Sequence, residues 1–181
     1  MEKIAKFEKV SFEEFKGKFT DLCIHHKIPQ FADDQLTQVY ESIQLPERST
    51  TGSAGYDFKS CFGFMLNPGM TMTIPTGIRV KINDGWMLTM VPRSSLGCKY
   101  RIQLDNTIGI IDSDYYYSDN EGHIMIKLTN DSKVDYNMLK INPGDKFVQG
   151  IFIPYGITID DNATGIRNGG FGSTDNKEVT D

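Results

Sequence analysis

The chain has 181 residues, of which 39% are hydrophobic and 24% are charged, and its formal net charge is −5. This composition is ordinary for a globular domain and excludes a chain that is disordered throughout. The length favours one domain with a small appendage. The negative charge disfavours a nucleic-acid-binding protein, which needs a basic surface, but arginines and backbone N–H groups can still bind a small anion.

The sequence also indicates where the protein works. It contains no apolar run long enough to span a membrane, and the charged N-terminus MEKIAKFEKV lacks the apolar stretch of a secretion signal. The three cysteines are far apart and form no CxxC pair, as expected for reduced thiols. We therefore expect a cytoplasmic protein that contacts neither a membrane nor nucleic acid.

Residues 1–45 are predicted to form a short strand followed by two helices. Ser11 and Glu14 have the spacing of a helix-capping box, and apolar residues follow at helical intervals until Pro29. A second helical pattern covers residues 36–43 and stops before a proline. We expect these helices to pack on the main domain; a surface that binds a protein partner is the alternative.

Residues 46–163 are predicted to form an antiparallel all-β core. Short apolar or alternating runs are separated by turn signals such as NPG, NDG and PYG, at a spacing typical of a β-sandwich or jelly roll. Residues 164–181 are rich in glycine and polar residues and are expected to form a flexible arm. The five clearest strands are 70–75, 77–82, 86–92, 123–128 and 146–154.

Three segments carry residues suited to binding or catalysis. Residues 92–97, PRSSLG, place an arginine and two hydroxyls at a strand end, as either an anion cradle or a solvated turn. In residues 109–115, GIIDSDY, Asp112 is either a turn cap or a carboxylate suited to general-base catalysis, and Tyr115 can stack on a ring. Residues 167–174, RNGGFGST, combine donors with glycines, as either a phosphate clamp or a flexible tail.

The remaining residues predict no metal centre and no nucleophile triad. His25 and His26 are neighbours that diverge on a helix, and the isolated His123 is expected to be structural. Residues 54–57 and 144–146 have the composition of turns.

Taken in order, five segments of the chain resemble the motifs of the trimeric deoxyuridine triphosphatases, the dUTPases. The run NEGHI after the third motif is similar to dUTPases of Gram-positive bacteria and their phages. The resemblance implies a jelly-roll subunit in a homotrimer, with three active sites between subunits, in a bacterial cytoplasm. The five segments are 52–57 (GSAGYD), 92–97, 106–115, 144–149 and 167–174.

The resemblance also implies a reaction and roles for particular residues. The expected reaction is hydrolysis of dUTP to dUMP and pyrophosphate, with Mg²⁺. Asp112 is expected to be the catalytic base, while Asp57 and Gln149 are expected to contact the metal only through water. The expected substrate-binding residues are Arg93, Ser94, Ser95, Asn106, Gly109, Ile110, Ile111, Tyr115, Met125, Gln149, Arg167, Phe171, Gly172, Ser173 and Thr174.

Five features depart from the family pattern, one of them a longer connection at residues 118–121 before Gly122. Tyr117 stands where a hairpin glycine is usual, Lys146 replaces a common arginine, and Asp175 replaces the last glycine of the fifth motif. Lysine keeps the charge of arginine but lacks its two-pronged donor geometry. Residues 11–45 have no counterpart in the common family pattern.

Two other functions are compatible with parts of this pattern. A dCTP deaminase has a related fold, but it needs a glutamate where Lys127 stands in this chain. A phage-type regulator would use the dUTPase body, together with the extra helices, to capture another protein. The second role does not exclude catalysis.

Overall fold

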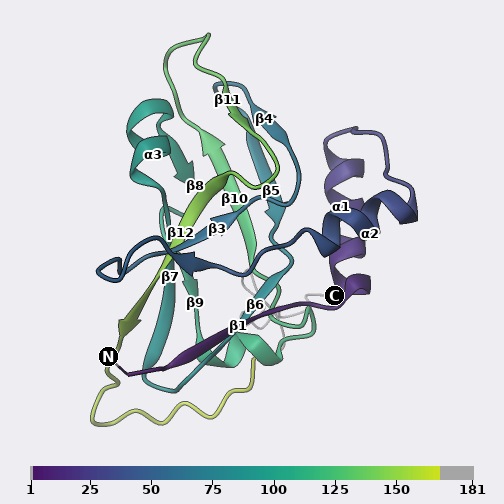
Figure 1. Cartoon of the computed structure of the whole chain (residues 1–181). Coiled ribbons are helices and arrows are strands. Elements are labelled where there is room, and N and C mark those ends of the chain that lie inside the picture. Colours follow the sequence, from purple (N-terminus) through teal and green to yellow (C-terminus); the bar gives the residue numbers. More distant parts are fainter. Residues whose placement is uncertain (1, 168–181) are drawn as a thin grey trace, which may run out of the picture.

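Antiparallel strands form the body of the molecule, and two N-terminal helices lie against one side of it (Figure 1). The structure, a computed structural model, describes residues 2–167. The predicted antiparallel β core with an N-terminal helical region is confirmed. Within the described range, no helix has the length and apolar character needed to cross a membrane. The predicted roles of Phe171, Gly172, Ser173 and Thr174, and the departure at Asp175, lie outside the described residues.

The largest sheet has five strands in the order β2-β3-β12-β7-β9. Its central strand, β12, comes from late in the chain and pairs antiparallel with β3 on one side and β7 on the other. Gln149 of β12 consequently lies opposite both Asp57 and Val91. The strands of this sheet are β2 (Glu47–Arg48), β3 (Tyr56–Lys59), β12 (Lys146–Pro154), β7 (Trp86–Pro92) and β9 (Gly109–Ile111).

Three smaller sheets complete the β body. β10 lies between β5 and β8, β11 pairs with β4, and β1 pairs with β6. Because β1 belongs to the N-terminal segment, strand pairing joins that segment to the core in addition to its helices. The strands of these sheets are β1 (Ala5–Lys9), β4 (Phe64–Leu66), β5 (Thr71–Pro75), β6 (Ile78–Ile82), β8 (Ile102–Leu104), β10 (Met125–Asn130) and β11 (Leu139–Ile141).

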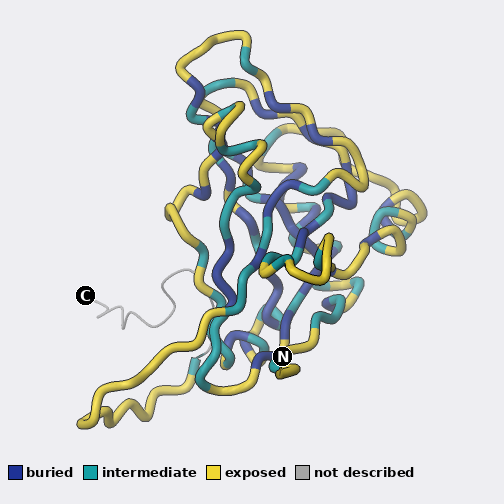
Figure 2. Tube along the Cα trace, turned by 60° about the vertical axis from the view of Figure 1, so that its left-hand side comes forward, coloured by how far each residue is buried: buried dark blue, intermediate teal, exposed yellow. Residues whose placement is uncertain are grey.

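The core between the sheets is mostly apolar, and alternation along the strands fills it (Figure 2). On β10, Ile126 and Leu128 are buried whereas Lys127 between them is exposed. The buried Asn130 side chain donates to the carbonyl oxygens of Leu66 and Asn137, at 2.9 and 3.0 Å, so its burial leaves no unpaired donor.

Helix α1 (Phe12–His25) packs on β5 and buries the apolar face that the sequence predicts. The buried residues are Phe15, Phe19, Leu22 and Cys23. Helix α2 (Asp33–Glu41) packs on α1 and buries Leu36. The helices therefore extend the apolar core on one side, as expected from their sequence pattern.

The start of α1 differs from the predicted capping box. Ser11 Oγ accepts a hydrogen bond from the Glu14 N–H at 3.2 Å, as expected, but the Glu14 side chain does not return to Ser11. Instead, the Glu121 carboxylate accepts from the Ser11 N–H at 2.7 Å and from its hydroxyl at 2.6 Å. A residue 110 positions away completes the cap, so the Glu14 carboxylate is available for a different partner.

Two short helices follow strands in places where the sequence suggests only strand ends and turns. Helix α3 (Ser94–Tyr100) begins directly after β7, and the 3₁₀ helix η1 (Ser113–Tyr117) begins after β9 and Asp112. Both are too short to show a periodic apolar pattern, so sequence analysis does not predict them. Residues 92–97 therefore form a strand end and the first turn of a helix.

Candidate active site

A pocket of about 330 Å³ lies among strands β7, β8, β9 and β10. Met90 and Leu104 contribute apolar walls, and the side chain of Tyr115 is buried beside them. The structure brings together many of the predicted substrate-binding residues here: Asn106, Gly109, Ile110, Ile111, Tyr115, Met125 and Arg167.

A glycine allows β9 to approach β7 closely on one side of this pocket. Gly109 lies opposite Met90 in the strand register, and a Cβ atom at Gly109 would stand only 3.0 Å from the Met90 Cβ. A larger residue would have to displace the methionine wall. The glycine of the third motif therefore has a packing role that the sequence does not reveal.

Asp112 and Arg167 form an ion pair, although they stand 55 positions apart in the chain, and of the two Arg167 lines the pocket. Arg167 Nη2 donates to the Asp112 carboxylate, and its Nε donates to Asp114 Oδ1 at 2.9 Å. Asp112 occupies the N-cap position of η1 but makes no side-chain cap hydrogen bond. Asp112 therefore starts the helix through its backbone, while its carboxylate binds Arg167 and makes no cap hydrogen bond.

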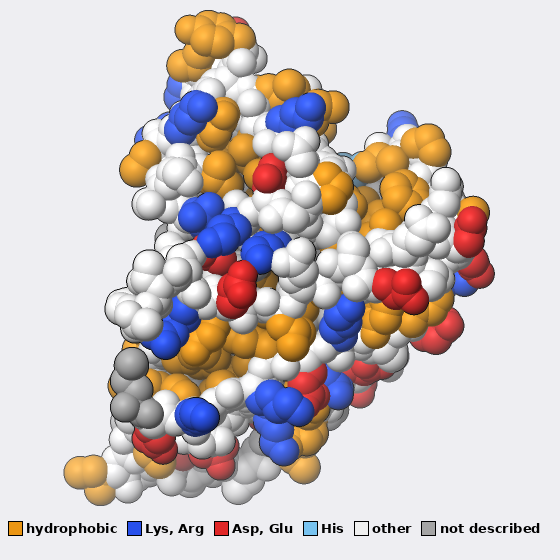
Figure 3. Space-filling view, viewed as in Figure 1, with side chains coloured by type: hydrophobic (Ala, Val, Ile, Leu, Met, Phe, Trp, Pro, Cys, Tyr) orange, Lys and Arg blue, Asp and Glu red, His pale blue; other side chains and the backbone are white. Residues whose placement is uncertain are grey.

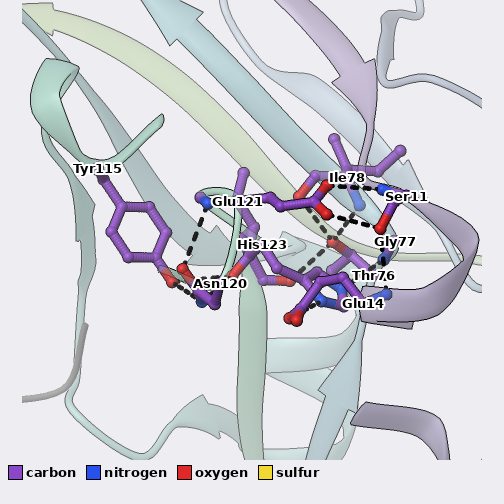
Figure 4. A network of polar contacts seen from close by, with 11 residues as sticks. Ser11, Glu14, Thr76, Gly77, Ile78, Tyr115, Asn120, Glu121 and His123 are labelled. Carbon is purple, nitrogen blue, oxygen red and sulfur yellow. Dashed lines mark hydrogen bonds and ion pairs between the residues drawn. The ribbon is translucent and has the colours of Figure 1, made fainter. Parts of the chain in front are cut away.

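Tyr115 is held from behind by the connection between η1 and β10 (Figure 4). Its hydroxyl donates to the His123 carbonyl oxygen at 2.9 Å and accepts from Asn120 Nδ2 at 2.8 Å. Burial raises the pKa of the Tyr115 phenol. The hydroxyl thus stays protonated at neutral pH, and the ring faces the pocket lined by Met125 and Arg167.

A second polar group lies at the ends of β3, β7 and β12. The nearly buried carboxylate of Asp57 accepts from Lys146 Nζ and from Ser49 Oγ, each at 2.7 Å, and pairs with Arg93 Nε at 3.1 Å. Burial raises the pKa of Asp57, but the hydrogen bonds from Lys146 and Ser49 and the charge of Arg93 outweigh it, so the net shift is downward. Basic and acidic side chains are seen together over β3 and β12 (Figure 3).

The predicted phosphate-binding residues cluster around this second group. Ser94 and Ser95 are exposed at the start of α3, immediately after Arg93. The side chain of Gln149 fills the space beside Gly55, where a Cβ atom would stand 2.4 Å from Gln149 Oε1. A side chain at Gly55 would therefore have to displace the end of the Gln149 side chain.

The two groups are separate in the single chain. Within residues 2–167, no hydrogen bond or ion pair joins the Asp57–Arg93–Lys146 group to the Asp112–Arg167 pair. The same range holds no group of three or more His, Cys, Asp or Glu residues that could bind a metal ion. His123 is fully buried and hydrogen-bonded, so it lies in a structural network.

Comparisons with known proteins identify this arrangement. A profile of the dUTPase family matches residues 41–175. The chain is 38% identical over 135 residues to the deoxyuridine 5'-triphosphate nucleotidohydrolase of Lactococcus lactis, which covers 73% of this chain and 88% of the relative. The same enzyme of Tolumonas auensis is 38% identical over 145 residues, with 76% and 91% covered. The chain belongs to the dUTPase family.

Solved structures of dUTPases have the same fold. The dUTPase of Streptococcus mutans superposes with a TM-score of 0.59 at 29% identity, over 84% of this chain and 97% of that one. The dUTPase of phage phi11 of S. aureus superposes with a TM-score of 0.57 at 24% identity, over 71% and 94%. The predicted similarity to dUTPases of Gram-positive bacteria and phages is confirmed.

This dUTPase is a dUTP diphosphatase, which hydrolyses dUTP to dUMP and pyrophosphate. The family match favours this activity over the dCTP deaminase alternative. The match begins at residue 41, so β1, α1 and nearly all of α2 lie outside the shared family region.

The dUTPase pocket also contains residues that sequence reasoning missed. Lys127 and Asp105 lie on its rim and form an ion pair at 2.5 Å. Met90 and Leu104 belong to its wall, and each occupies a buried position on a strand. The alternation of β7 predicts that Met90 faces inward, but no local signal indicates that a ligand pocket lies there.

Proposed function

We propose that the pocket holds the deoxyuridine part of dUTP and that Asp112 acts as the general base of the hydrolysis. The observation that carries this proposal is that Arg167 binds the Asp112 carboxylate and also lies 6.0 Å from the centre of the Tyr115 ring, which lines the pocket. The Tyr115 ring would pack beneath the deoxyribose, and Asn106 with the backbone of the neighbouring strands would contact the uracil edge. Gly109, Ile110, Ile111 and Met125 would complete the enclosure.

The proposed reaction is attack of water on the α-phosphorus. Asp112 accepts a proton from the water, the new oxygen–phosphorus bond forms, and the bond from the α-phosphorus to its bridging oxygen breaks. Pyrophosphate leaves with the electron pair of that bond, and dUMP remains. Without substrate, the Arg167 guanidinium group donates to the Asp112 carboxylate. The bound triphosphate must therefore draw the guanidinium group away before Asp112 can accept the proton.

The second polar group would bind the phosphates. Arg93 supplies positive charge, and Ser94, Ser95 and Gln149 supply hydrogen bonds, with Mg²⁺ neutralising the triphosphate when bound. The Asp57 carboxylate already binds Lys146 and Ser49, which fits contact with a metal through water better than direct ligation. The phage phi11 enzyme coordinates a structural Mg(II) ion. The arm residues Phe171, Gly172, Ser173 and Thr174 would close over the nucleotide.

We further propose that the active protein is a homotrimer whose sites combine residues of neighbouring subunits. The separation of the two polar groups within one chain supports this. So does the segment after β12, which extends away from the body with three exposed isoleucines (Figure 2): Ile157, Ile159 and Ile166. We take a second copy of the chain as the partner that would cover these exposed apolar side chains. The chain would then consist of the 46–163 core, the 1–45 segment and a 164–181 arm.

Two measurements test these proposals. Incubation with each deoxynucleoside triphosphate and Mg²⁺, followed by chromatography, should release pyrophosphate from dUTP alone. Mixed trimers of Asp112→Asn and Arg93→Ala should regain activity that neither variant has alone, because some sites would combine two intact groups. If light scattering shows a monomer and that monomer is fully active, the shared site is contradicted.

A second role, binding a regulatory protein through the N-terminal helices, is supported by an apolar groove of about 320 Å³ between α1 and β4–β5. Phe19, Phe31 and Met70 line it, and exposed apolar side chains lie on α1 and on the connection to α2 (Figure 3). Phage 80alpha dUTPases are described as controlling transfer of virulence genes. Loss of a bound protein in Phe31→Asp, with dUTP turnover intact, would support the role.

The free cysteines fit a cytoplasmic location.

A further inference from the structure

Residue His123 links the N-terminal helix to the proposed substrate pocket (Figure 4). Its buried side chain contacts Glu14 on α1, and its backbone carbonyl oxygen accepts a hydrogen bond from the hydroxyl of Tyr115. The helix lies outside the region that matches the dUTPase family, whereas Tyr115 lies inside it. A segment added to the family fold thus contacts the back of the pocket.

The imidazole ring of His123 is fixed at both nitrogen atoms. Its Nε2 accepts a hydrogen bond from the Gly77 N–H at 2.8 Å, and its Nδ1 lies 3.1 Å from Glu14 Oε1. Since Nε2 is an acceptor, the neutral ring carries its proton on Nδ1 and donates it to the Glu14 carboxylate. Burial lowers the pKa of His123 to about 4, so the neutral form persists at physiological pH.

The backbone of the same residue holds the tyrosine. The His123 carbonyl oxygen accepts from the Tyr115 hydroxyl at 2.9 Å, and Asn120 Nδ2 donates to that hydroxyl at 2.8 Å. The Asn120 carbonyl oxygen in turn accepts from the His123 N–H at 3.0 Å. The connection after η1 therefore surrounds the phenol with one acceptor and one donor, so that a single ring position satisfies both bonds.

A second attachment ties this connection to the start of α1. The Glu121 carboxylate caps Ser11, with bonds of 2.7 and 2.6 Å. Burial raises the pKa of Glu121, but the two bonds from Ser11 outweigh it, so the carboxylate is ionised at neutral pH. The helix therefore holds residues 118–123 at two points, Glu14 to His123 and Ser11 to Glu121.

We propose that helix α1, through Glu14 and His123, positions the Tyr115 ring for binding deoxyribose and that Glu14, Asn120 and His123 are positioning residues for dUTP. The proposal rests on the role of Tyr115 given above. None of the three positioning side chains needs to touch the substrate. They set the ring height and tilt, and with them the space that a ribose 2′-hydroxyl would have to enter.

The variants Glu14→Ala and Asn120→Ala each remove one link. Each is expected to raise KM for dUTP by about 3-fold to 10-fold, the effect of one hydrogen bond, and to lower the preference for dUTP over UTP, with little change in kcat. Glu14→Gln keeps an acceptor oxygen for His123 Nδ1–H and should restore values close to those of the wild type. Glu13→Ala removes an exposed carboxylate from the same helical turn and serves as the matched control.

Combination with Tyr115→Phe is the decisive measurement, because it separates positioning from general stability. If Glu14 acts through the tyrosine hydroxyl, Glu14→Ala should add nothing to the KM of Tyr115→Phe. Additive effects of Glu14→Ala and Tyr115→Phe on KM, or an unchanged KM in Glu14→Ala, would overturn the inference while leaving dUTP hydrolysis by Asp112 intact. An unchanged KM and UTP preference in Tyr115→Phe would overturn the inference, because the hydroxyl would then not set the ring position, while the packing role of the ring itself would stand.

Discussion

The guanidinium group of Arg167 binds the carboxylate of Asp112, 55 positions earlier in the chain, and no backbone N–H competes for that carboxylate as a helix cap. The side chain of Asp112 is 42% exposed and that of Arg167 is 22% exposed. Both side chains are therefore reachable from solvent, so an incoming phosphate can exchange for the carboxylate as the partner of the arginine.

We expect Asp112→Asn to lower dUTP turnover by about 10²–10⁴-fold, because the amide keeps the shape of the side chain but cannot accept a proton from water. Binding of a non-hydrolysable dUTP analogue should be retained. Asp114→Asn is the control, since Asp114 binds the same arginine. Equal loss of turnover in both variants, or near wild-type turnover in Asp112→Asn, would contradict the assignment.

We expect Arg167→Ala to lower turnover more than tenfold while the melting temperature of the free protein stays within about 2 °C of the wild type. The carboxylates of Asp112 and Asp114 are partly exposed, and exposed ion pairs add only about 0–1 kcal/mol to stability. Truncation after Gly165 should behave in the same way. Turnover assays and thermal melting measure the two effects, and a large drop in melting temperature would show that the contact is structural.

The Asp57 carboxylate should make the protein more resistant to acid. Its pKa is below the ordinary value of 3.8, so its contribution to the free energy of unfolding is complete above pH 3.8 and is lost as pH falls through the lower, folded-state pKa. Lys146→Ala removes one of its cations and should move acid unfolding to higher pH, whereas Lys146→Arg should not. The control is Lys140→Ala, which removes a lysine side chain that is exposed on β11. Identical acid unfolding of Lys146→Ala and wild type would refute this account.

His123 should make stability depend on pH in a higher range. Its folded-state pKa is about 4 and its ordinary value is 6.5, so the unfolded chain binds the extra proton and the free energy of unfolding should fall as pH drops from 6.5 to about 4. Burial is the main cause, with Lys18 acting in the same direction and Glu121 against it.

Glu14, which faces the same ring, has a raised pKa because of burial and works in the opposite direction. The comparison is therefore made between variants. Denaturant unfolding is measured at several pH values between 4 and 6.5. The free energy of unfolding should change less with pH in His123→Gln than in the wild type and in His25→Gln. Equal slopes in all three proteins would show that His123 does not titrate as described.

Two glycines with positive φ angles provide a matched stability test. Gly69 has a φ angle of +80° and open space around it, whereas at Gly122, with a φ angle of +70°, a Cβ atom would lie 2.7 Å from Tyr116 Cα and 2.8 Å from the Tyr115 carbonyl oxygen. Gly69→Ala should cost about 1 kcal/mol of unfolding free energy from backbone strain alone. Gly122→Ala should cost clearly more and also raise KM, and equal costs would contradict this.

The strands could be predicted from the sequence because their signal is local. β5, β6, β7 and β12 follow the predicted runs within one residue at each end, since alternating apolar residues and turn residues mark them directly. The residues of the third motif were expected around one pocket only from their resemblance to a family.

The missing parts depend on contacts that no local spacing encodes. Glu121 caps Ser11 across 110 positions, and Glu14, which has the spacing for that cap, binds His123 instead. Helix α3 is too short to leave a period in the sequence. That Asp57 and Asp112 have different cationic partners follows from which strands pair, a property of the whole sheet.

The position of β12 has a consequence for synthesis of the protein. The strand lies at the centre of the five-stranded sheet, between β3 and β7, yet its residues end at Pro154. While the ribosome has not yet released this strand, β3 and β7 are both exposed edges without their shared neighbour, and open edges of this kind pair readily with other chains. Premature termination before residue 146 would therefore leave two unpaired edges rather than a shortened enzyme.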